Sequence, residues 1–298
     1  MSINKLVKFC DSKYIERKQQ CLDCPNRKQG ECSSCNCSKC FQEMFFSSGR
    51  TFNCVSSTYS YVCRYIYQYS SELQYLLNIY RSLFVDENGN QKLDKINIIS
   101  IGCGPCSEAF AFENFLKDIN FTGDVSFCGY DLNKHWETIH SQVSSLLPFK
   151  MNFYYQDCFE HISNVDNYQY PNVLILNYVL SDIAKNGDIQ KFIESITSKL
   201  VDKMPSKSII IINDINHYNP RDAYKKFIRS MIQTNNIGYD SFSFIGYQYG
   251  KRYKYNNIFF SLGEKALLYL QKKYETKTNC SSAQLIVYKK SNLINNKF

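Results

Sequence analysis

Apolar side chains change their spacing along the 298-residue chain, and each spacing is typical of a different kind of structure. Between residues 55 and 83, apolar or aromatic residues recur three and four positions apart, and the stretch contains neither Gly nor Pro. This spacing places them on one face of a helix, so we predict a long amphipathic helix over residues 55–83. We interpret its tyrosines Tyr59, Tyr69 and Tyr80 as core packing.

From residue 95 the pattern becomes an alternation of short β-branched runs and amphipathic segments. Regular alternation of this kind indicates a parallel sheet with helices on both faces. Strands are predicted over residues 96–101, 125–130, 151–156, 173–176 and 208–212. Helices are predicted over residues 107–117, 134–147, 181–200 and 220–233.

The C-terminal part departs from this alternation. Strand-like runs at residues 241–247, 258–262 and 284–288 surround a short predicted helix at residues 264–274. We therefore expect a terminal antiparallel hairpin attached to a doubly wound α/β sheet.

Cysteines are concentrated near the beginning of the chain. Nine of the 14 lie before residue 64, and six of these form three Cys-x2-Cys pairs. Residues 5–49 show little apolar periodicity, so a bound metal would have to supply their stability. Without a secretory signal the thiols are expected to stay reduced and available as ligands. Zinc takes four tetrahedral ligands, and we predict the set Cys21, Cys24, Cys37 and Cys40.

Other ligand sets remain open for the same segment. The pair Cys32 and Cys35 could replace the last two ligands of that set, with a shorter loop between the pairs. An iron–sulfur cluster would also suit four thiolates.

Composition limits the class of protein. The chain is 44% hydrophobic and 21% charged, which suits a folded domain. The first residues are too polar for a signal peptide, and no run approaches the ~20 apolar residues of a membrane helix, so we expect a cytoplasmic protein without a membrane partner. The net charge of +8 is compatible with nucleic acid, RNA in particular, as partner or substrate.

The stretch with the clearest chemical content is residues 97–108. A buried strand runs into Gly102 and Gly104, which permit a tight turn and let the backbone approach a ligand closely. Asp131 ends the second strand and Asp157 the third, so the glycine turn and both carboxylates share the sheet edge where ligands bind. A carboxylate at Asp131 can accept both hydroxyls of a ribose.

Over residues 95–290 this arrangement resembles the class I S-adenosylmethionine (SAM) dependent methyltransferases, whose first motif is similar to residues 98–108. The resemblance implies a Rossmann-like fold, SAM as cofactor and methyl transfer as the activity. We accordingly divide the chain into a Cys-rich zinc-binding module (1–50), a helical linker or cap (51–90) and a SAM-binding methyltransferase-like domain (91–298).

The same resemblance implies roles for individual residues. Gly102 and Gly104 would line the methionine and ribose side of SAM, and Asp131 would take the ribose hydroxyls. Asp157 and Cys158 would lie beside the adenine. The remaining expected cofactor-binding residues are Cys103, Pro105, Glu108, Leu132 and Asn177.

Asn177 and Tyr178 fall where the family's fourth motif lies, near the transferred methyl group, and are the predicted catalytic residues. Two features depart from the family pattern. Cys106 replaces the usual third glycine of the first motif, and Asn177-Tyr-Val-Leu differs from the Asn/Asp-Pro-Pro-Tyr of enzymes that methylate exocyclic base amines. A dinucleotide is the competing cofactor, but its fingerprint needs Gly where this chain has Ser107.

Two classes of function remain open. The first is a SAM-dependent methyltransferase, with RNA slightly favoured as substrate because residues 246–255 interleave aromatics with Lys251, Arg252 and Lys254. The same run also suits a solvated hairpin turn. The second class is a non-catalytic interaction module that keeps the SAM fold and uses its zinc module to bind a protein partner.

Overall fold

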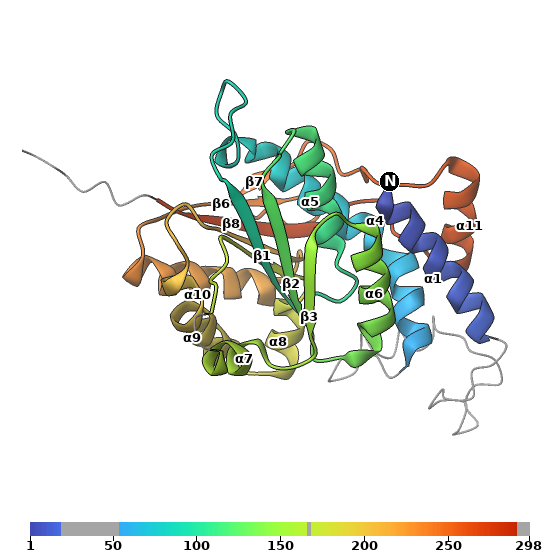
Figure 1. Ribbon diagram of the computed structural model, residues 1–298, viewed down its shortest axis with the longest axis horizontal. Helices are drawn as coiled ribbons and strands as arrows, with labels where there is room; N and C mark the ends of the chain where they lie inside the picture. The colour runs from blue at the N-terminus through green and yellow to red at the C-terminus, as the bar shows by residue number, and fades with distance from the viewer. Residues whose placement is uncertain (19–53, 166–167, 291–298) are drawn as a thin grey trace, which may run out of the picture.

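Among the residues that the computed structural model describes, 1–18, 54–165 and 168–290, an eight-stranded sheet separates two layers of helices (Figure 1). The strands are β1 (Lys95–Ile101), β2 (Asp124–Tyr130), β3 (Lys150–Tyr154), β4 (Val173–Asn177), β5 (Ile209–Ile215), β6 (Ile237–Ser243), β7 (Lys251–Arg252) and β8 (Ser282–Lys289). The α-helices are α1 (Ser2–Lys18), α4 (Val55–Ile79), α5 (Ser107–Asp118), α6 (Glu137–Leu146), α7 (Cys158–Asn164), α8 (Leu180–Asn186), α9 (Ile189–Lys199), α10 (Tyr218–Thr234) and α11 (Glu264–Tyr274). Short 3₁₀ turns cover Arg81–Leu83, Lys134–Trp136 and Val201–Lys203.

The strand order is β3-β2-β1-β4-β5-β8-β6-β7. Strands β1 to β5 are parallel, and β8 lies antiparallel between β5 and β6. The predicted doubly wound α/β sheet is therefore confirmed. Its antiparallel pair consists of β6 and β8, which are separated in sequence by β7 and α11 and so do not form a direct hairpin.

Strand residues alternate between two apolar cores, one on each face of the sheet. In β4, Val173 and Ile175 belong to the core under α4, α5 and α6, whereas Leu174 and Leu176 belong to the core under α9 and α10. All four side chains are fully buried. Because successive side chains point to opposite faces of a strand, a continuous apolar run is what a sheet covered on both sides requires.

Helices α1 and α4 thicken one of the two layers. Helix α4 packs along α5, and α1 packs against α4 and α6. The buried side chains of α1 are Ile3, Leu6, Val7, Cys10 and Tyr14. Helix α1 was not predicted, because residues 5–49 were interpreted as lacking apolar periodicity. Up to Lys18 this interpretation was wrong: the buried residues recur three and four positions apart, and packing against α4 and α6 stabilises this part without a metal.

A buried carboxylate on α4 connects this layer to the sheet. Glu72 has no solvent exposure. Burial raises its pKa, and hydrogen bonds from Ser281, Asn213, Gln68 and Tyr178 oppose that shift by stabilising the charged form. The donors to Oε1 are Gln68 Nε2 at 3.1 Å and the N–H groups of Ser281 and Ser282 at 2.8 and 3.2 Å; those to Oε2 are the Tyr178 hydroxyl at 2.9 Å and Asn213 Nδ2 at 3.0 Å.

Three predicted elements differ from the structure. The strand expected over residues 241–247 is β6, Ile237–Ser243, which begins and ends four residues earlier. The helix expected over residues 181–200 is broken into α8 and α9 at Gly187, where the Asp188 carboxylate caps α9 by accepting from the N–H groups of Gln190 and Lys191, both at 3.0 Å. No strand forms over residues 258–262, so the prediction of a strand there was wrong.

Residues 258–262 instead cross α4. The N–H groups of Phe259 and Phe260 donate to the Ser71 hydroxyl at 2.8 and 3.3 Å, and Phe260 is buried in the core beneath α4. The apolar side chains of this run therefore reflect packing against a helix and not pairing in the sheet.

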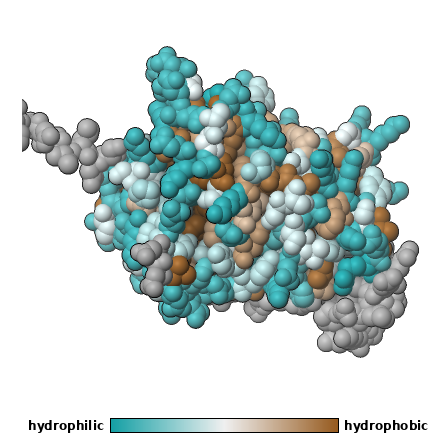
Figure 2. All heavy atoms as spheres, viewed as in Figure 1, coloured by the Kyte–Doolittle hydropathy of each residue, from teal (hydrophilic) through white to brown (hydrophobic). Residues whose placement is uncertain are grey.

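The surface seen in Figure 2 is mostly hydrophilic, with smaller apolar areas between the polar side chains. None of the helices in the described ranges is long and apolar enough to cross a bilayer.

We expect Glu72→Gln to lower the free energy of unfolding by about 3 kcal/mol, because an amide group would turn two hydrogens toward N–H and O–H donors in a buried place. Urea titration followed by circular dichroism measures the change. Glu87→Gln, at an exposed position in the turn after α4, is the matched control and should stay within about 0.5 kcal/mol of the parent. Equal stability of the two variants would contradict the role assigned to Glu72.

Candidate functional site

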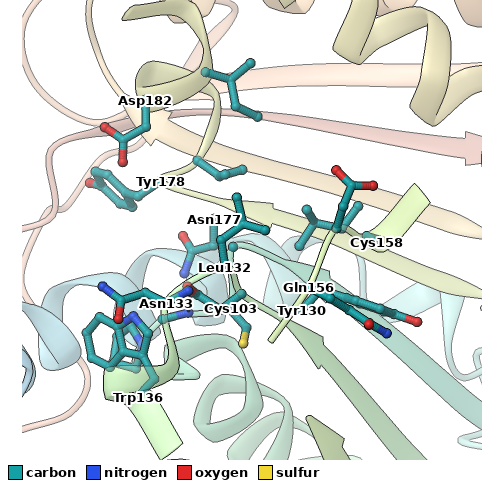
Figure 3. A pocket seen from close by; sticks show the side chains of 18 of the residues that line it. Cys103, Tyr130, Leu132, Asn133, Trp136, Gln156, Cys158, Asn177, Tyr178 and Asp182 are labelled. Atoms are coloured by element: carbon teal, nitrogen blue, oxygen red, sulfur yellow. Dashed lines mark hydrogen bonds between the residues drawn. The ribbon is translucent and has the colours of Figure 1, made fainter. Parts of the chain in front are cut away.

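A cavity of about 920 Å³ opens at the carboxyl ends of β1, β2, β3 and β4. Figure 3 shows side chains from these four strand ends converging on it, among them Cys103, Tyr130, Gln156 and Asn177. Here the strand order reverses, since β1 lies between β2 and β4. Such a reversal leaves the crevice in which doubly wound sheets bind ligands.

The loop between β1 and α5 bends through left-handed backbone conformations. Gly102 has a φ of +66°, and a Cβ atom there would lie 2.6 Å from Cγ2 of Val179, so only glycine fits without moving that neighbour. Cys106, in the position of the family's third glycine, has a φ of 56°. The loop thus keeps the geometry that glycine favours while a cysteine bears a cost of about 1 kcal/mol.

The Asp131 carboxylate is bound to this loop. Its Oδ2 accepts from the N–H of Gly104 at 2.9 Å, and its Oδ1 accepts from the N–H of Asn133 at 2.8 Å. Burial raises the pKa of Asp131 to about 6, although both N–H groups act in the opposite direction. The group is charged at neutral pH, and each oxygen keeps a lone pair for a further donor, such as a ribose hydroxyl.

A buried histidine holds the other side of the loop. His140 Nε2 lies 2.8 Å from the carbonyl oxygen of Gly104, and Nδ1 lies 2.9 Å from the Tyr155 hydroxyl. Since a carbonyl only accepts, Nε2 carries the proton and Nδ1 accepts from Tyr155. Burial lowers the pKa of His140 to about 4, so the imidazole is neutral at physiological pH.

In the described part of the chain, Cys103, Cys106 and His140 form a group of potential metal ligands whose ligand atoms lie within 4.8 Å of one another. Burial raises the pKa of both thiols, and the protonated nitrogen of His140 is used by Gly104. This arrangement favours packing over metal binding. The predicted zinc ligands Cys21, Cys24, Cys37 and Cys40 lie outside the described residues.

Glu108 does not line the cavity. It is fully buried behind the loop, where it hydrogen-bonds the hydroxyls of Ser100 and Ser107. Asn177 does line the cavity, but its amide is used within the protein: Nδ2 donates to Ser107 at 2.8 Å and Oδ1 accepts from Asn213 Nδ2 at 2.8 Å. Glu108 and Asn177 thereby fix the start of α5 against the end of β4.

Tyr178 borders the cavity with a strained backbone, at a φ of 57°. Its N–H donates to the Asn213 carbonyl at 2.7 Å, and its hydroxyl donates to Glu72. Burial, followed by the charge of Glu72, raises the pKa of Tyr178 well above its usual range. The hydroxyl therefore stays protonated, and Tyr178 shapes the cavity without serving as a proton acceptor.

One side of the cavity is apolar. Leu132, with 77% of its surface exposed, borders it together with Cys158, Phe159 and Phe192. The Asp157 carboxylate also lines this side and caps α7 by accepting from the N–H of Glu160 at 2.9 Å. An exposed leucine next to a cavity is the kind of surface that a flat apolar ring covers on binding.

The sequence analysis placed Gly102, Cys103, Gly104, Pro105 and Asp131 at one edge, and the structure brings all five to the cavity. Leu132, Asp157, Cys158, Asn177 and Tyr178 line it as well.

Six aromatic residues that line the cavity were not predicted as site residues: Tyr61, Tyr69, Tyr130, Trp136, Phe159 and Phe192. Trp136 is buried beside Gly104, where an added Cβ atom would lie 3.7 Å from its ring, and it contacts Tyr61 edge to face at 5.9 Å. It is the one tryptophan of the chain and follows Asp131 by five positions, which is a usable signal. Tyr61 and Tyr69 belong to the helix that was interpreted as packing, and they pack and line the cavity at once.

No protein-family model matches the sequence, and no curated protein matches it. A Listeria monocytogenes protein assigned to the class I SAM-dependent methyltransferases has a similar structure, with a TM-score of 0.50 and 13% identity over 98% of this chain and 89% of that one.

Two further solved structures match less closely. A Klebsiella pneumoniae protein assigned as an O-methyltransferase gives a TM-score of 0.44 and 7% identity, over 74% of this chain and 80% of that one. An O-methyltransferase from Bacillus cereus, solved in complex with S-adenosylhomocysteine, gives 0.40 and 12%, over 74% and 80%. With the sheet order and the position of the cavity, the likeness to the Listeria protein shows that this chain has the Rossmann-like fold of class I SAM-dependent methyltransferases.

Proposed function

We propose that this protein is a SAM-dependent methyltransferase that holds SAM in the cavity at the carboxyl ends of β1 to β4. The observation that carries the proposal is the pairing of the Gly102–Gly104 loop with the Asp131 carboxylate at the ligand crevice of this fold. The volume of about 920 Å³ is that of a small-molecule site.

The residues present fit the chemistry of SAM. Asp131 has acceptor capacity left for two ribose hydroxyls, and Leu132 and Cys158 offer an apolar surface to the adenine. Gly102 and Gly104 line the cavity without side chains, so the backbone can approach the methionine part closely. SAM, when bound, would supply a methyl group on a positively charged sulfur. Transfer of that methyl group would leave the sulfur as a neutral thioether.

The chain's own contribution to transfer is alignment. The Asn177 amide is bound at both ends by Ser107 and Asn213, and the Tyr178 hydroxyl is bound to Glu72, so neither is free to accept a proton from an acceptor. Their fixed positions instead shape the space beside the cofactor. Displacement at a methyl carbon depends mainly on such alignment, because holding two reactants in line removes much of the entropic barrier.

Replacing Asp131 tests the cofactor site. Asp131→Asn should weaken binding of SAM and S-adenosylhomocysteine about 30-fold or more, because the charged acceptor of the hydroxyls is lost. Calorimetric titration of the metal-replete protein measures the affinities. Asp124→Asn, an exposed aspartate at the start of the same strand, should bind like the parent. A folded parent protein that binds neither compound would refute the proposed function.

The affinity for SAM should also depend on pH. The pKa of Asp131 is raised to about 6, so its carboxylate is charged above that pH and takes up a proton below it. Only the charged form accepts both hydroxyls, so the affinity should fall as the pH is lowered from 7 to 5, approaching tenfold per pH unit below 6. His140, with a pKa of about 4, adds little in this range. Asp131→Asn should remove the slope; a parent profile that is flat would contradict this assignment.

We also propose that residues 1–50 bind zinc through Cys21, Cys24, Cys37 and Cys40, which the spacing of the pairs supports. Elemental analysis of protein purified under reducing conditions should give about one zinc ion per chain. Cys21→Ser with Cys24→Ser should lose it, whereas Cys128→Ser, on β2, should retain it. Iron with visible absorbance in place of zinc would contradict the choice of metal.

A further inference from the structure

A second cavity, of about 620 Å³, lies beside the first. It is bounded by α4, by the end of α11 and by residues 275–281, which lead into β8. Tyr69 and Tyr178 line both cavities, so the cofactor space and the second space adjoin at these two residues. A molecule in the second cavity would therefore lie next to the predicted position of the transferred methyl group.

Three nearly parallel tyrosine rings run along this boundary. Tyr178 stacks on Tyr69 with ring centroids 3.8 Å apart and an angle of 19°, and Tyr69 stacks on Tyr65 at 5.3 Å and 14°. All three line the second cavity. Because the rings use their faces for one another and are almost fully buried, what remains for the cavity is their edges, and aromatic edges favour contact with the face of another planar ring.

The polar groups of the second cavity are mostly neutral amides and hydroxyls. No hydrogen bond within the described ranges uses the side chains of Gln271, Thr278 or Asn279, which leaves their donors and acceptors for a ligand. Gln68, in contrast, is fixed by Glu72 and Ser281. A mixture of free donors and acceptors beside aromatic rings matches the edge and face of a nucleobase.

Charge is confined to the rim. Glu275 is held by Arg64 at 2.7 Å, and Lys277 is exposed and makes no ion pair with any described residue. A buried phosphate or carboxylate would need a buried cation, which the described lining does not contain. The lining therefore suits a neutral base inside the cavity and a phosphate at the entrance, beside Lys277.

The rim continues onto an exposed aromatic surface. Ile215 borders the cavity, and its neighbour Asn216 donates to the carbonyls of Ile245 and Tyr247, both at 2.8 Å. Tyr247 is 77% exposed, with the Arg221 guanidinium 5.4 Å from its ring centre. An aromatic ring beside a cation next to the entrance suits the flanking nucleotides of an unpaired strand.

The basic–aromatic run singled out in the sequence is only partly available for such contacts. Arg252 donates to the carbonyls of Phe244 and Gly246, Lys251 pairs with Asp240, and Tyr253 is largely buried. The exposed Tyr247 is the member of this run that adjoins the entrance.

We propose, on the basis of the proposed methyltransferase function, that the second cavity is the acceptor site and takes one unpaired base of a single-stranded nucleic acid. The edges of the Tyr65, Tyr69 and Tyr178 rings contact the face of the base, the free amides and hydroxyls bind its edge, and Lys277 holds a backbone phosphate.

Photo-crosslinking of the full-length, metal-replete protein locates the ligand. The probes are an eight-nucleotide RNA carrying 4-thiouridine, a DNA of the same sequence and the corresponding RNA duplex. The single strands should crosslink to peptides containing Tyr65, Tyr69 or residues 271–281, and the duplex should not. The ratio of RNA to DNA affinity distinguishes the two sources of the base. Crosslinks confined to residues 19–53 or to other surfaces would overturn the proposal.

Affinity measurements with variants provide the matched test. Gln271→Ala combined with Lys277→Ala should raise the Kd for the single strand roughly tenfold in fluorescence anisotropy, with SAM affinity unchanged. Lys272→Ala, an exposed lysine of α11 outside the cavity, should bind both ligands like the parent. Equal RNA affinity of the two variants would overturn the acceptor assignment, as would transfer of tritiated methyl groups from SAM to protein fractions alone.

The two proposals fail separately. Loss of SAM binding in the calorimetric titration, which contains no nucleic acid, contradicts the methyltransferase function. Absence of nucleic-acid binding with intact SAM binding contradicts only the acceptor site.

Discussion

The position of Glu72 is the constraint on which the rest of the site depends. A carboxylate without solvent exposure is stable only when its lone pairs are satisfied, and here five donors from α4, β5 and the ends of β4 and β8 supply them. The same contacts orient Tyr178, whose left-handed backbone would otherwise be unfavourable. Helix α4 is thus part of the site and not merely a cover over the sheet.

Two buried groups, Asp131 and His140, hold the loop between β1 and α5. Burial raises the pKa of Asp131 and lowers the pKa of His140. Asp131 accepts from the N–H of Gly104 and His140 donates to its carbonyl, so the peptide groups on both sides of Gly104 are fixed. Burial makes Asp131 harder to ionise and His140 harder to protonate. As the pH falls from 6 to 4, Asp131 takes up a proton in the folded state and loses an unfavourable buried charge, which stabilises the fold. Over the same range the histidine becomes charged in the unfolded chain while the buried His140 stays neutral, which destabilises the fold. The two effects on folding oppose each other over that range.

Some aromatic side chains belong to the core and line a cavity at the same time. Tyr65, Tyr69 and Tyr178 form a stack within the core, and Tyr69 and Tyr178 also line both cavities. Because Tyr69 and Tyr178 are almost fully buried, packing fixes their positions, and fixed positions are what the proposed alignment of a methyl donor and an acceptor requires.

The sequence by itself determined the order of elements, the doubly wound sheet and the loop residues Gly102, Gly104 and Asp131, because periodicity and strand ends are local properties. Helix α1 and the loss of a strand at residues 258–262 depended on packing between distant segments, whereas the break at Gly187 follows a local signal, the cap that Asp188 forms on α9. The roles of Glu72 and Trp136, and the position of Glu108 behind the loop, also depended on such packing. A buried carboxylate and an exposed one look the same in a sequence. Only the tertiary structure, by bringing donors from residues 68 to 282 around one side chain, decided which it is.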